Sequence, residues 1–169
     1  MKKNYASFCT RVFSAALFLN LFVSTQSFSQ LVVTARGTPQ GIVNAFVGSG
    51  LSVSNINLNC GADTTNAAYG TFNGSSSNIG LPNGVILTTG DATLAVGPNV
   101  NSSNGADRLV GTVDPQITAI EPLATHDLCV LEFDIVPHCS SLQLRFVFGS
   151  EEYPEFVNSG YNDVFGFFV

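Results

Sequence analysis

The chain has 169 residues, a formal net charge of −6, 14 Phe and only 11% charged residues. This composition excludes a charge-rich disordered tail, which has few aromatic residues, and a coiled coil, which needs Glu, Lys and Leu at heptad spacing. The acidic balance also argues against a nucleic-acid binder, since such proteins carry basic patches. The length suits one domain.

Residues 1–29 have the pattern of a secretory signal peptide. The segment begins with basic residues, continues with an apolar run over 12–23, and ends with the small residues Ser27 and Ser29 at the positions that a signal peptidase reads. That run has 12 residues, too few for the roughly 20 that a membrane-spanning helix needs. We therefore predict cleavage near Ser29 and an exported mature chain over 30–169.

The mature chain is strongly acidic. It has no lysine, and its three arginines are outnumbered by twelve Asp and Glu residues, which gives a formal charge of −9. Acidity favours solubility and cation binding, and it disfavours anionic partners such as nucleic acid or lipid headgroups. Beyond the signal peptide no stretch is long enough to cross a membrane.

A short strand and a short helix are expected at the start of the mature chain. Residues 31–36 predict the strand. Thr38 suits the N-cap of the helix and Pro39 its first position, and apolar residues at i, i+1 and i+4 give the segment 39–47 one apolar face. Glycines from Gly48 onward end this helix, the only one that the sequence predicts.

From residue 51 the apolar residues alternate, which is typical of strands. Residues 51–60 predict one strand, and the apolar run 85–87 between turn residues predicts another. The glycines between them indicate turns, since no Gly-Lys-Ser/Thr element of a phosphate-binding loop occurs. Residues 97–107 predict a polar loop of 11 residues, a length often seen in binding loops.

Two alternating segments in the last third predict an antiparallel hairpin. The odd positions of 128–136 and the even positions of 142–148 are apolar, and 137–140 separates the segments. If that separation is the loop, the apolar residues share one face and Glu132 lies opposite Arg145 as a cross-strand ion pair.

Three cysteines remain in the mature chain: Cys60, Cys129 and Cys139. Export permits one disulfide with one leftover thiol, or a partner outside this chain. An extended strand of about eight residues separates Cys129 from the turn that holds Cys139, which is beyond disulfide reach. We predict no Cys129–Cys139 bridge and leave the pairing open.

Residues 163–169 predict a further strand, apolar on both faces and therefore central. Because the chain ends inside it without a polar tail, we expect a fragment of a longer protein, since a bare sheet edge would otherwise remain. The fold prediction is all-β: a two-sheet β-sandwich, jelly-roll-like, with one short N-terminal helix and a truncated C-terminus.

Several motifs together resemble the choice-of-anchor L domain, a family of large exported proteins of Bacteroidetes-type bacteria. The runs 146–156 (FVFGSEEYPEF) and 161–168 (YNDVFGFF) carry the resemblance, which covers about residues 40–169. Shorter matches lie at 50–55, 84–90 and 131–134. The resemblance implies further domains after this one, often a type IX secretion sorting signal or a gliding-motility region that supplies the anchor.

Acidic residues gather near these motifs: Glu151, Glu152, Glu155 and Asp163. Calcium takes about six to eight oxygen ligands, largely carboxylates and carbonyls, so these four are candidate calcium ligands and calcium is the candidate cofactor. The alternative is a structural turn in which the carboxylates cap backbone amides beside Pro154.

A candidate ligand-binding site overlaps this cluster. Tyr153 and Tyr161 offer stacking faces for a sugar, unless they simply pack. The segment 162–168 is weakly similar to the Asp-plus-apolar strand of legume-type lectins, where the Asp accepts sugar hydroxyls. Asn162 and Asp163 are therefore candidate ligand-binding residues as well.

Zinc and catalytic sites find little support. His126, Cys129, His138 and Cys139 have suitable side chains, but the alternation sets Cys129 a strand away from His138, so the four are not expected to converge. No Gly-x-Ser-x-Gly elbow occurs. For a glycosidase pair, carboxylates about 5–9 Å apart, only Asp163 with a nearby Glu stays geometrically open.

The sequence thus predicts a non-catalytic, exported domain of the cell surface or extracellular space that serves adhesion or ligand binding. Its expected partner is an extracellular glycan or a surface protein. Nucleic acid is not an expected partner, and the anchor is expected in the missing C-terminal region. Two alternatives stay open: a structural spacer module and, with less support, a glycan hydrolase.

Overall fold

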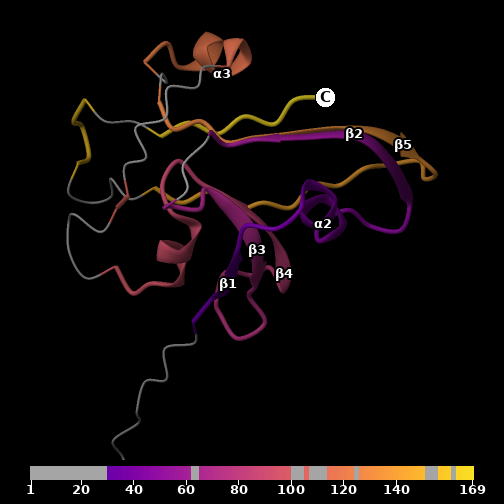
Figure 1. The fold of residues 1–169 in the computed structure, drawn as a ribbon, viewed down its shortest axis with the longest axis horizontal. Helices are drawn as coiled ribbons and strands as arrows, with labels where there is room; N and C mark the ends of the chain where they lie inside the picture. The colour runs from indigo at the N-terminus through magenta and orange to yellow at the C-terminus, as the bar shows by residue number, and fades with distance from the viewer. Residues whose placement is uncertain are drawn as a thin grey trace, which may run out of the picture.

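The computed structural model describes residues 30–61, 65–99, 105–106, 114–123, 126–150, 156–160 and 163–169. Its strands form two antiparallel sheets, one in the order β1-β3-β4 and one that pairs β2 with β5 (Figure 1). The strands are β1 (Val32–Ala35), β2 (Leu51–Asn59), β3 (Tyr69–Asn73), β4 (Asn83–Leu87) and β5 (Val130–Pro137). The helices are α2 (Pro39–Asn44), the 3-10 helix η1 (Ala92–Val96) and α3 (Pro115–Ile120). The prediction of an all-β fold with two sheets is confirmed.

Helix α2 confirms the one predicted helix and supplies the two largest fully buried side chains of the described residues. The Thr38 hydroxyl accepts a hydrogen bond from the Gly41 backbone N–H at 3.1 Å, so the expected cap is present. Ile42 and Val43 are 1% and 0% exposed. The helix ends at Asn44, three residues before the predicted end.

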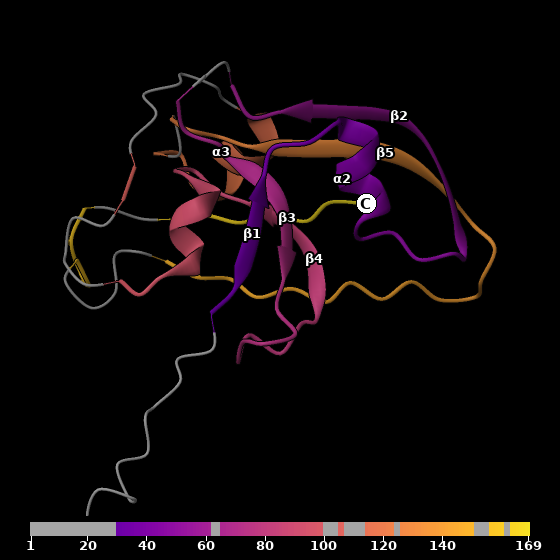
Figure 2. The same ribbon diagram turned by 60° about the horizontal axis from the view of Figure 1, so that its bottom comes forward.

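The helix packs against the β2–β5 pair, as Figures 1 and 2 both show. The rings of Phe46 and Phe133 meet edge to face, with centroids 5.7 Å apart. This is a favourable arrangement for two aromatic side chains. The contact therefore joins the segment after α2 to the inner face of β5.

The three-stranded sheet contains one strand that the sequence did not predict. Strand β3 lies between β1 and β4, with Gly70 opposite Ala35 on one side and Ile86 on the other. Gly70 suggested a turn, yet it serves close packing, because a Cβ there would meet the backbone carbonyl oxygen of Thr34. Phe72 of the same strand is buried. The strands predicted at 31–36 and around 85–87 are confirmed as β1 and β4.

The two-stranded sheet shows the predicted alternation but not the predicted partner. In β5 the side chains of Leu131, Phe133 and Ile135 are less exposed than those of Glu132 and Asp134. The strand pairs with β2, which confirms the strand predicted at 51–60, and Glu132 lies opposite Asn57. The Arg145 guanidinium instead donates to the Gly80 carbonyl at 3.1 Å. The predicted hairpin, its register and its Glu132–Arg145 ion pair are therefore wrong.

The segment after β5 leaves the β2–β5 pair (Figure 2) and forms no strand over 141–150. Its alternating apolar side chains are exposed, as are several in 163–169, which also forms no strand. The two segments touch through Phe165, whose ring centroid lies 5.2 Å from that of Phe146 and 6.4 Å from that of Phe148. The prediction of a central strand at 163–169 is thus wrong, because these residues associate through side chains rather than through a backbone ladder.

Two helical segments were not predicted. Helix α3 begins after Asp114, whose carboxylate accepts from the backbone N–H groups of Gln116 and Ile117 at 2.8 and 3.1 Å. Helix η1 begins after Asp91, whose carboxylate accepts from the Thr93 N–H at 2.8 Å. None of the helices in the described parts of the chain is long and apolar enough to cross a membrane.

Candidate functional site

Most residues predicted to bind calcium or a ligand lie outside the described residues. This holds for Glu151, Glu152, Tyr153, Glu155, Tyr161 and Asn162, and also for the predicted signal peptide. Asp163 alone is described, and it is half-buried at the start of the segment 163–169. Both sites therefore stay predictions. The loop predicted at 97–107 is described only at 97–99 and 105–106.

The described residues contain no group of three or more His, Cys, Asp or Glu side chains arranged to hold a metal ion. Among the four zinc candidates, Cys129 is bound in a disulfide. The calcium prediction therefore depends on the acidic cluster around Asp163 and on a solution test.

Millimolar calcium is expected to raise the melting temperature of the purified protein by a few degrees, because a ligand that binds only the folded state stabilises it. A calcium titration with thermal unfolding followed by circular dichroism measures this, and chelation with EDTA should reverse it. Magnesium is the control ion, since it prefers a smaller, strictly octahedral site. The same melting temperature with calcium and with EDTA would contradict the prediction.

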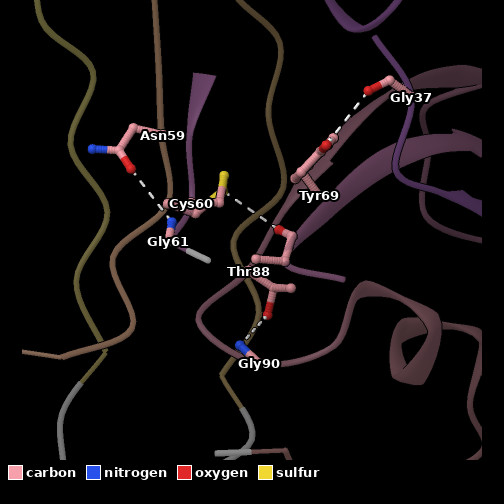
Figure 3. Close-up of a disulfide and its surroundings, with 9 residues drawn as sticks. Gly37, Asn59, Cys60, Gly61, Tyr69, Thr88 and Gly90 are labelled. Atoms are coloured by element: carbon pink, nitrogen blue, oxygen red, sulfur yellow. Dashed lines mark hydrogen bonds between the residues drawn. A yellow bond between two sulfur atoms is a disulfide. The ribbon is translucent and has the colours of Figure 1, made fainter. Parts of the chain in front are cut away.

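The disulfide joins Cys60 to Cys129 and leaves Cys139 as an exposed free thiol, so the predicted absence of a Cys129–Cys139 bridge is confirmed. Cys60 follows β2 and Cys129 precedes β5, so the bridge continues the β2–β5 pairing by one residue pair. Figure 3 shows its surroundings. The Cys129 sulfur lies 3.5 Å from the Ala68 carbonyl oxygen, directly before β3, so the bridge lies where the two sheets meet.

The exposed face of β2 and β5 carries a row of polar side chains that bond across the two strands. The Asn57 amide donates to Glu132 at 2.9 Å, and the Asn55 amide donates to Asp134 at 2.6 Å. At the end of the row, the Ser52 hydroxyl lies 2.8 Å from a ring nitrogen of His138. We refer to these six side chains as the polar row.

The polar row arises from the alternation of both strands. Apolar residues such as Val53 and Ile135 lie opposite each other on the less exposed face, so the Ser, Asn and acidic residues between them occupy the exposed face. The row was not predicted, although the repeated Ser and Asn residues of 52–59 indicate it in the sequence. Amides, carboxylates and hydroxyls held in fixed orientations are donors and acceptors suited to a neutral polar ligand.

Comparisons with known proteins found a match to a family model. The family model described as the Choice-of-anchor L domain matches residues 31–169. Searches of the curated proteins and of the solved structures found no match. The matched range includes both sheets, the disulfide and the polar row.

Proposed function

The chain belongs to the Choice-of-anchor L domain family, and from this premise we propose that it is an adhesion module that binds neutral extracellular glycans. Membership indicates a surface-associated, non-catalytic module of an exported or surface protein. Adhesion through a glycan is the finer step, and the polar row is the observation that supports it.

The row has the chemistry that a sugar needs. Sugar hydroxyls both donate and accept, and planar amides and carboxylates bond to adjacent hydroxyls in pairs. Asn57, Glu132, Asn55 and Asp134 present such groups on an exposed face. Their bonds across the strands limit side-chain motion, which lowers the entropy lost when a ligand binds.

Charge narrows the class of glycan. The mature sequence carries a formal charge of −9, and two members of the row, Glu132 and Asp134, are acidic. A sulfated or uronic-acid polymer would be repelled, so the proposed ligand is a neutral polysaccharide.

The test is a glycan array followed by co-sedimentation with insoluble neutral polysaccharides. We expect binding to neutral glycans, and about tenfold weaker binding for Asn57→Ala, which removes one charge-assisted hydrogen-bond partner from the row. Asn78→Ala is the matched control, since Asn78 is also exposed but lies outside both sheets, and it should bind as the wild type does. A folded protein without signal on any neutral glycan would overturn the proposal and leave the spacer module as the better description.

A further inference from the structure

The middle of the polar row meets an open cleft. The cleft has a volume of about 380 Å³ and lies between the N-terminal turn of α2 and the middle of β2. Its lining residues are Thr38, Pro39, Gln40, Ser54, Asn55 and Ile56. Asn55 belongs both to this cleft and to the polar row, through its bond to Asp134.

A β-bulge shapes the β2 side of this cleft. The pairing with β5 shifts between Ser54 and Asn57, and Asn55 has a φ of +52°. This left-handed conformation is uncommon for a residue other than glycine. As a result Ser54 and Asn55 are both exposed, whereas regular alternation would turn one of them inward. Bulges commonly re-aim side chains in this way at functional positions.

The polar side chains of the cleft are held in place and still have capacity to bind. The Gln40 amide donates to the Asn44 side chain at 2.8 Å, which leaves the Gln40 carbonyl oxygen as an acceptor. Asn55 donates to Asp134, which leaves its own side-chain oxygen as an acceptor. Thr38 accepts from the Gly41 N–H, and its hydroxyl proton is still available to donate.

The composition of the cleft defines a ligand class. None of its lining residues is charged, and Pro39 and Ile56 contribute apolar surface beside the hydroxyls and amides. A sugar ring matches this mixture, since it has hydroxyls at its rim and C–H groups on its faces. The volume of about 380 Å³ lies near the lower end of ligand pockets, which is room for a short saccharide unit.

We propose that this cleft holds one terminal or branch unit of a neutral glycan whose chain continues along the polar row. The inference rests on the proposed function and adds the position of the specificity-determining unit. Gln40, Ser54 and Asn55 are then the residues that select the sugar.

The test uses neutral hexasaccharides as probes: cello-, xylo-, manno- and laminarihexaose. Binding of each to the purified protein is measured by isothermal titration calorimetry and by NMR shifts of backbone amides. We expect at least one probe to bind, with shifts at 38–40 and 54–56. Gln40→Ala should weaken that binding about tenfold.

Gln143→Ala is the matched control, since Gln143 is an exposed glutamine outside the cleft, and it should bind as the wild type does. A melting temperature of the Gln40→Ala variant equal to that of the wild type excludes a folding defect. If a probe binds but Gln40→Ala has no effect and the NMR shifts lie elsewhere, the proposal for the cleft is overturned while glycan binding stands. If no probe binds the folded wild type and the array is also silent, both proposals fall.

Discussion

Removal of the Cys60–Cys129 disulfide is expected to lower the free energy of unfolding by about 4 kcal/mol. The two cysteines are 69 residues apart in sequence, and a cross-link over a loop of this length removes roughly that much chain entropy from the unfolded state. The double variant Cys60→Ala/Cys129→Ala avoids an unpaired thiol in the core, since Cys60 is only 5% exposed. Urea unfolding followed by circular dichroism measures the loss.

Cys139→Ser is the control for this experiment. Cys139 is exposed and free, so its replacement should change the free energy of unfolding by less than about 0.5 kcal/mol. Reduction of the wild type with dithiothreitol should reproduce the effect of the double variant. A double variant as stable as the wild type would show that the bridge does not limit the unfolded chain.

Ile42→Ala is expected to cost about 3 kcal/mol of stability. The side chain is 1% exposed in helix α2, and truncation of a buried isoleucine loses its transfer free energy and leaves a cavity, which together cost about 2–5 kcal/mol. Thermal and urea unfolding of the variant measure the difference. Ile42→Val, which removes one methyl group, should cost about 1 kcal/mol.

The matched control is Ile120→Ala at the last residue of α3. Ile120 is 56% exposed, so its truncation should cost less than about 1 kcal/mol. Equal losses at Ile42 and Ile120 would contradict the position of α2 in the core.

Local signals in the sequence predicted the elements that they control directly. Thr38 and Pro39 set the start of α2 because a cap and a fixed φ act within one turn. Asp114 and Pro115 form the same signature before α3, so the start of that helix was predictable as well. Strand β3 was missed because Gly70 suggests a turn, while its real role depends on the approach of β1, a long-range feature.

The sequence did not show which strand pairs with β5. Alternation fixes which residues of a strand share a face, and that prediction held for β5. It does not specify which of several alternating segments pairs with it. The segment 142–148 and strand β2 both satisfy the pattern, and β2 additionally offers Asn57 to Glu132 and a disulfide next to the last residue pair.

Only the chemical character of the candidate site was predictable from the sequence. A polar, acidic surface that favours a neutral ligand follows from the composition, and the Ser and Asn residues of β2 are plain in the sequence. The cross-strand pairs of the polar row required the β2–β5 register, which spans about 80 residues of chain. Prediction of the cleft would have needed the bulge at Asn55, a backbone feature that no sequence motif indicates.

The position of the disulfide also bears on when the fold reaches its full stability. Disulfides form in oxidising compartments and are rare in the cytosol, so the newly made chain lacks the bridge between Cys60 and Cys129. Strands β2 and β5 are far apart in sequence and must pair without it, with the entropy of the intervening loop opposing them. Before oxidation the chain is therefore easier to unfold. Oxidation then closes the β2–β5 pair, so the fold reaches its full stability only in an oxidising compartment.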